Sequence, residues 1–153
     1  MFQRILIAYD GSVEGKRMLV ASGELTAFTK AEAHLLAVAS LPSANLYMTE
    51  GLPPEQLMDD EKKIAQEILD EGVAQFRERG FAVVGHLAVG DPVEEICRLA
   101  KELNCDLIVV GHVHRSTLGR WWQASVGRAS VSKSLLDAAP CAVFVARTVV
   151  DDE

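Results

Sequence analysis

The strongest constraint on the fold is an alternation along the chain between short apolar runs and stretches with helical periodicity. The first run, Arg4–Tyr9, is uncharged after its arginine, as expected of a strand buried on both faces of a sheet. Similar runs follow at residues 33–39, 81–89, 106–110 and 142–146, and helical patterns fill the intervals at 13–29, 56–79, 92–103 and a stretch ending near Asp137. This β-α-β order predicts an α/β fold, with helices on both faces of one parallel sheet.

Capping residues and apolar spacing describe two of these helices in more detail. Asp91 and Pro92 suit the N-cap and the first helical position of the helix that they begin. In the helix over 13–29, the residues that we expect to face the sheet are Leu19, Ala21, Leu25 and Phe28.

Composition limits the possible partners and compartments. The chain has 153 residues, of which 49% are hydrophobic, and we expect one domain over residues 1–148 with a short acidic tail at 149–153. The net charge of −7 argues against a nucleic-acid partner, and no apolar run approaches the roughly 20 residues that cross a membrane. The three cysteines form no Cys-x-x-Cys pair and no signal peptide is recognisable, so we expect a cytoplasmic protein with free, at least half-buried thiols.

Ligands of open α/β sheets bind outside the carboxyl ends of the strands, where the strand order reverses. The loop after Gly111 carries the most informative residues near such an end. It contains His112, His114, Arg115, Arg120 and Arg128, followed by Ser-Val at the start of a helix. Cations, hydroxyls and backbone N–H groups at a helix N-terminus form an anion site, so this loop predicts a phosphate-binding region.

Four segments give the chain a recognisable resemblance. They are Ile-Leu-Ile-Ala-Tyr-Asp-Gly-Ser at 5–12, Val-Gly-Asp-Pro at 89–92, Asp-Leu-Ile-Val-Val-Gly-His at 106–112 and Ala-Pro-Cys-Ala-Val-Phe-Val-Ala at 139–146. From about Phe2 to Ala146 the chain resembles a universal stress protein domain. The resemblance implies a three-layer α/β/α fold of the adenine nucleotide alpha-hydrolase-like type, with five parallel strands in the order 3-2-1-4-5. It also implies an adenine nucleotide (ATP, ADP or AMP), with or without Mg²⁺, and a homodimer.

The resemblance places the nucleotide at the carboxyl ends of the first and fourth strands. On the adenosine side it implies Asp10, with Ala8 and Tyr9 before it and the backbone of Val38. On the phosphate side it implies Gly111, His114, Ser125 or Ser130, Val131 and Ser132. Ordinary structural roles compete with these: Asp10 suits a turn or helix cap, the serines suit helix caps, and Val38 suits the core.

The phosphate side departs from the family's pattern of Gly, two residues, Gly, nine residues, Gly and then Ser or Thr. Gly111 matches its first glycine, but His114 stands at the second and Ala124 at the third. The segments 124–128 and 129–133 also read as a tandem duplication, Ala-Ser-Val-Gly-Arg followed by Ala-Ser-Val-Ser-Lys. A helix that began after Ser125 would extend about 7.5 Å farther toward the phosphates than one beginning after Ser130. Gly127 favours a loop for the first copy.

The remaining motifs favour binding over catalysis. His112 and His114 lack a third ligand, so we expect no metal site, and the pair Trp121 and Trp122 suits packing or a subunit contact. No nucleophile elbow, zinc-protease or Walker A motif occurs. The leading hypothesis is therefore a regulatory stress-response protein that binds an adenine nucleotide. The alternatives are a dimeric interaction protein without nucleotide, paired through the fifth strand at 142–146, and a weak ATP hydrolase.

Overall fold

The computed structural model describes residues 2–40, 54–112 and 131–147. Its helices and strands are β1 (Arg4–Ala8), α1 (Val13–Thr29), β2 (Glu32–Ala39), α3 (Pro54–Glu78), β3 (Val84–Val89), α4 (Pro92–Glu102), β4 (Leu107–His112), α6 (Val131–Ala138) and β5 (Ala142–Arg147). The sequence predictions for residues 113–130 and for the tail at 149–153 lie outside the described ranges.

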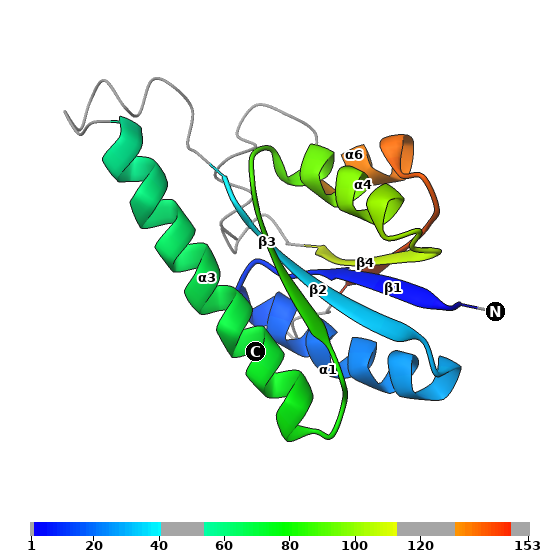
Figure 1. Ribbon diagram of the computed structural model, residues 1–153. Coiled ribbons are helices and arrows are strands. Elements are labelled where there is room, and N and C mark those ends of the chain that lie inside the picture. Colours follow the sequence, from blue (N-terminus) through cyan, green and yellow to red (C-terminus); the bar gives the residue numbers. More distant parts are fainter. Residues whose placement is uncertain (1, 41–53, 113–130, 148–153) are drawn as a thin grey trace, which may run out of the picture.

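The strands form one parallel sheet in the order β3-β2-β1-β4-β5 (Figure 1), which confirms the predicted order. β1 pairs with β2 on one side and with β4 on the other. The chain therefore builds the sheet outward in two directions from β1, and the strand order reverses between β1 and β4. β3 and β5 are the two edges of the sheet.

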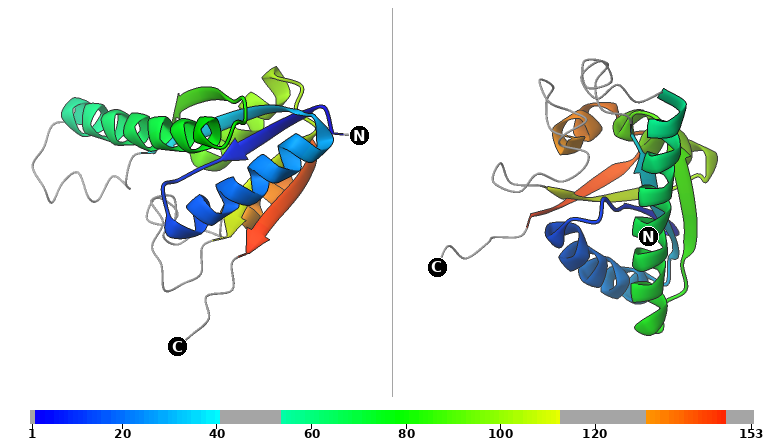
Figure 2. Two further views of the ribbon diagram at one scale, coloured as in Figure 1. Left: turned by 90° about the horizontal axis from the view of Figure 1, so that it is seen from below. Right: turned by 90° about the vertical axis from the view of Figure 1, so that its left-hand side faces the viewer.

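Helices cover both faces of the sheet, as the β-α-β order predicts. α1 and α3 pack on one face, through a core that includes Met18, Leu19 and Phe76. α4 and α6 pack on the other, through a core that includes Ile96 and Leu135. In Figure 1 α4 and α6 lie above the strands and α1 below them, and the views of Figure 2 show the same layers. β1 is buried on both faces, which explains its uninterrupted apolar run.

Local signals set the helix ends as expected. Asp91 caps α4 by accepting a hydrogen bond from the Glu94 N–H at 3.1 Å, and Pro92 begins the helix. α1 is capped at its C-terminus by Lys30, whose left-handed φ of 57° lets the N–H of Ala31 reach back to the Thr26 carbonyl at 3.2 Å.

The predicted inward face of α1 was wrong at two residues. Ala21 and Phe28 do not face the core: Ala21 is exposed, and Phe28 is 88% exposed near the end of α1. The helix instead buries the polar residues Ser22 and Thr26, and Gly23 lies so close to Phe81 that a Cβ would come within 2.7 Å of its ring.

The third strand was also predicted too long. It begins at Val84, where pairing with β2 begins opposite His34, and not at residue 81. Phe81 continues the turn after α3 instead, with its N–H bonded to the Phe76 carbonyl and its ring edge-on to the Phe76 ring. Apolar residues packed at a helix end thus resemble a strand in sequence.

Candidate functional site

The turn after β1 presents a buried carboxylate at the carboxyl end of the sheet. Asp10 is 8% exposed, and its Oδ1 accepts a hydrogen bond from the Ser12 N–H at 3.0 Å. In the described part of the chain, Oδ2 of Asp10 has no hydrogen-bond partner. Ser12 is the N-cap of α1, since its Oγ accepts from the Gly15 N–H at 3.0 Å. The turn thus orders Asp10 and leaves one carboxylate oxygen available.

Gly111 brings the end of β4 against the first turns of α1. A Cβ at this position would lie 3.6 Å from Met18 Sδ and 4.0 Å from the Cα of Gly15, which is ordinary contact. Val110, the residue before Gly111, pairs with Ala8 of β1. The register therefore places Ala8, Asp10 and Gly111 together at the carboxyl end of the sheet, where the strand order reverses.

Val38 lies at the same end of the neighbouring strand, two residues beyond Leu36, the partner of Ala8. Its side chain is 6% exposed and belongs to the core beneath α4. The next residue, Ala39, accepts a hydrogen bond from the Gly90 N–H at 3.0 Å, so the end of β2 is tied to the start of α4. The Val38 side chain is thus part of the core, which leaves only its backbone for contacts at the carboxyl end of the sheet.

The side chain of Tyr9 belongs to the core beneath α1 and α3. Its ring packs against Gly15 of α1 and Gly72 of α3, where a Cβ would come within 2.9 Å and 3.0 Å of ring carbons. The hydroxyl is buried and has no hydrogen-bond partner in the described structure. Burial, and secondarily the negative charges of Glu71 and Asp10, raise the pKa of this phenol. Tyr9 therefore contributes packing, and its N–H is already bonded to the Leu36 carbonyl.

The predicted phosphate side is described only in part. His114, Ser125 and Ser130, with Trp121 and Trp122, lie outside the described residues. Val131 and Ser132 form the start of α6. Across the ranges that the structure covers, no group of three or more His, Cys, Asp or Glu side chains is arranged to hold a metal ion.

The sequence analysis missed a chain of side chains near the amino ends of β2 and β3. His34 Nε2 lies 2.8 Å from Glu32 Oε1, and His34 Nδ1 lies 2.9 Å from His86 Nε2. Because a carboxylate only accepts, the proton of neutral His34 is on Nε2, and Nδ1 accepts from His86. Burial and the neighbouring His34 lower the pKa of His86. Glu32 and His34 lie two residues apart on β2, so their side chains share one face, and His86 lies on the neighbouring strand β3. The strand order makes β2 and β3 neighbours, and the pairing register brings the side chains together.

The three cysteines are free, with Cys105 buried and the other two half-buried, as expected. Burial is the main cause that raises the pKa of each thiol. No helix in the described ranges has the length and apolar character needed to cross a membrane.

Comparison with known proteins shows the family as well as the fold. The family model described as "Universal stress protein family" matches residues 1–147 of this chain. The chain belongs to the universal stress protein family. Universal stress protein YxiE from Bacillus subtilis is 29% identical over 153 residues, which cover 96% of this chain and all of that protein. A universal stress protein family structure from Burkholderia pseudomallei is 26% identical, with a TM-score of 0.70 over 94% of this chain and 95% of that one.

Two less similar universal stress protein structures contain a nucleotide. One, in complex with cAMP, is 24% identical, with a TM-score of 0.71 over 97% of this chain and 99% of that one. The other, from Arabidopsis thaliana with AMP bound, is 21% identical, with a TM-score of 0.66 over 97% of this chain and 94% of that one. At these identities the likeness shows a shared fold.

Proposed function

We propose that this universal stress protein binds an adenine nucleotide at the carboxyl ends of β1 and β4 and acts as a regulatory module without strong catalytic activity. The observation that carries the proposal is the Asp10 carboxylate. It is nearly buried where the strand order reverses, and one oxygen lacks a partner among the described residues. A ribose hydroxyl or an adenine amino group would supply the donor that this oxygen accepts.

The neighbouring strand ends complete the adenosine side of the proposed site. Ala8, Tyr9 and Val38 would contribute backbone around the adenosine, and Gly111 would begin the phosphate side, next to Gly15. The complexes of similar folds with cAMP and with AMP support an adenine ligand of this kind. Both are monophosphates, which agrees with an intact adenosine side.

On the phosphate side the proposal rests on the sequence. His114, Ser130 and the start of α6 at Val131 and Ser132 would meet the phosphates, with Ser125 as the alternative to Ser130. Glycine is favoured where backbone approaches phosphate, since it has no Cβ. His114 and Ala124 replace two such glycines, so we expect ATP to lose more affinity than AMP or ADP compared with relatives that keep them.

Calorimetry with AMP, ADP and ATP on the wild-type protein and two isosteric variants tests the proposal. Asp10→Asn should weaken AMP binding about tenfold, which corresponds to about 1.4 kcal/mol. Its amide oxygen can still accept from the Ser12 N–H, so the turn is retained. Asp106→Asn is the matched control, because Asp106 accepts from the Gln3 and Arg4 N–H groups at the start of β1, at the opposite end of the sheet.

If Asp10→Asn and Asp106→Asn bound AMP with equal affinity, Asp10 would not be part of the binding site. No heat and no thermal shift with any adenine nucleotide at millimolar concentration would overturn the nucleotide proposal as a whole. Phosphate release from ATP that is lost in His114→Ala would instead support the weak hydrolase.

The second candidate is an interaction protein that acts as a homodimer through β5. β5 is an edge of the sheet, and its Phe144 is 52% exposed. An exposed apolar edge strand favours pairing with another strand. Sedimentation at micromolar concentration should therefore show a dimer, and Phe144→Lys should shift it toward the monomer. A wild-type protein that sediments only as a monomer would contradict this candidate.

A further inference from the structure

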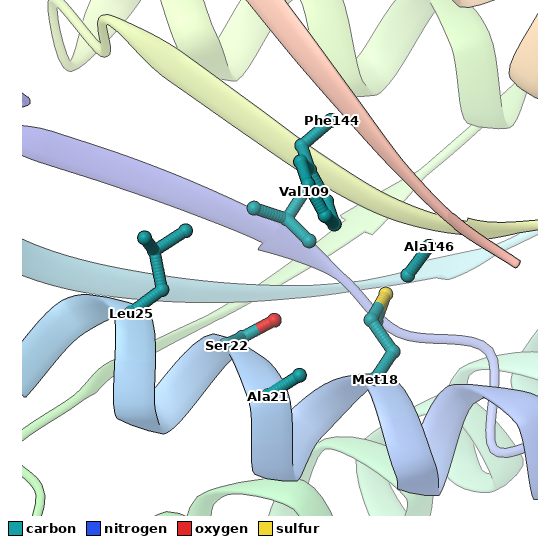
Figure 3. Close-up of a pocket in the computed structure, with 7 residues that line it drawn as sticks. All are labelled: Met18, Ala21, Ser22, Leu25, Val109, Phe144 and Ala146. Carbon is teal, nitrogen blue, oxygen red and sulfur yellow. The ribbon is translucent and has the colours of Figure 1, made fainter.

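A cavity of about 120 Å³ lies between α1 and the two strands at one side of the sheet, β4 and β5 (Figure 3). Met18 and Leu25 of α1 line one wall, and Val109, Phe144 and Ala146 line the other. Val109 and Phe144 are partners in the sheet, so their side chains point to the same face, toward α1. Phe144 is 52% exposed, which opens the cavity to solvent at the edge of the sheet.

Among the described residues of the lining, one polar side chain faces the apolar ones. The Ser22 hydroxyl comes from α1 and points toward the strands in Figure 3. Ser22 is 2% exposed, and its Oγ has no hydrogen-bond partner among the described residues. A buried hydroxyl without a partner is unfavourable, because it has lost its bonds to water and made none in return. A molecule that entered the cavity with an oxygen near Ser22 would restore that bond.

We propose that this cavity binds a small, mainly apolar molecule that carries one hydroxyl group, of the size of phenol or a short aliphatic alcohol. The size agrees with this class, since an engineered apolar cavity of about 150 Å³ in another protein binds benzene. The single hydroxyl matches the Ser22 hydroxyl, the one polar side chain among the described residues of the lining. The described residues that line the cavity include no charged side chain, so a nucleotide does not suit it.

Methyl NMR titrations with phenol and toluene test the proposal, because the two ligands have similar size and differ in the hydroxyl. Phenol should cause saturable shifts at the Met18 and Ala146 methyls of the wild-type protein. Ser22→Ala should weaken phenol binding three- to tenfold, about 0.7–1.4 kcal/mol. The same variant should not weaken toluene binding. Ala146→Leu, which fills the cavity, should weaken both ligands.

Three results would overturn the proposal. The first is the absence of saturable phenol shifts at the Met18 and Ala146 methyls. The second is an equal change in the affinities for phenol and toluene in Ser22→Ala, which would show that the Ser22 hydroxyl does not bond to phenol. The third is a folded Ala146→Leu variant that binds both ligands as the wild type does.

Two controls separate other occupants of the cavity. If phenol converts a dimer to a monomer in sedimentation, a second copy of the chain fills the cavity, and the small ligand is wrong. If AMP displaces phenol, the cavity is part of the nucleotide site, and a separate site is wrong. If the protein binds phenol but does not bind AMP, the result supports this inference and contradicts the nucleotide proposal.

Discussion

Replacing Tyr9 by phenylalanine removes a hydroxyl that the fold buries without a partner. Tyr9 is 1% exposed, and its oxygen makes no hydrogen bond within the described residues. Burying such a group costs about 1–3 kcal/mol, whereas the ring keeps its contacts with Gly15 and Gly72. The substitution also leaves a void of about 10–15 Å³, the room of one water. At about 24 cal/mol per Å³ this void costs about 0.3 kcal/mol.

We therefore expect Tyr9→Phe to raise the free energy of unfolding by about 1–2 kcal/mol. Urea unfolding should show a higher midpoint with an unchanged slope, and the melting temperature should rise by about 2–4 °C per kcal/mol in a domain of this size. Ser22→Ala should also stabilise the protein, because Ser22 carries the other buried hydroxyl without a partner among the described residues.

Thr26→Val is the contrasting control. Its hydroxyl is equally buried but donates to the Ser22 carbonyl at 2.7 Å, so its loss should destabilise the fold by about 0.5–1.5 kcal/mol. If Tyr9→Phe lowered the stability by more than 0.5 kcal/mol, on the order of one hydrogen bond, the Tyr9 hydroxyl must have a partner. The expected stabilisation by Tyr9→Phe would then be wrong.

Further predictions concern pH, close packing, helix capping and the duplication. The pKa of Tyr9 is raised in the fold, so above its ordinary value near 10 the unfolded chain releases a proton that the native state keeps. The urea midpoint should consequently fall as the pH rises above about 10, and fall less steeply in Tyr9→Phe. Gly23→Ala places a Cβ 2.7 Å from two carbons of the Phe81 ring. It should destabilise the fold by about 1–2 kcal/mol after the gain in helix propensity, and a neutral effect in urea unfolding would contradict the close contact. Asp91→Ala should lower the free energy of unfolding by about 1 kcal/mol in the same assay, and Asp91→Asn should lower it much less. Equal losses in the two variants would show that the helix cap does not cause the destabilisation. Deleting residues 124–128 should leave ATP affinity in calorimetry unchanged, whereas a tenfold gain would show that the first copy of the repeat blocks the site.

The sequence by itself determined the layers of the fold and the order of its helices and strands along the chain. The β1 run and the capping signals at Asp91 and Pro92 depend on residues next to each other in the chain, and the structure agrees with each of them. The strand order came from the family resemblance, and the pairing of β1 with β2 and β4 confirms it. With that order, the predictions for Ala8, Asp10 and Gly111 place them together at the carboxyl end of the sheet, because parallel strands end together.

Only the tertiary structure decided which faces and partners these elements use. Helical spacing marked Phe28 as buried, but in the packed structure Phe28 is exposed and α1 buries Ser22 and Thr26 instead. The predicted strand order placed β3 beside β2, but the pairing register and the packed side chains decided that His34 and His86, 52 residues apart in sequence, come within 2.9 Å of each other. Periodicity and capping are local properties, whereas the burial of a hydroxyl or the pairing of two imidazoles depends on atoms that meet only after the layers pack together.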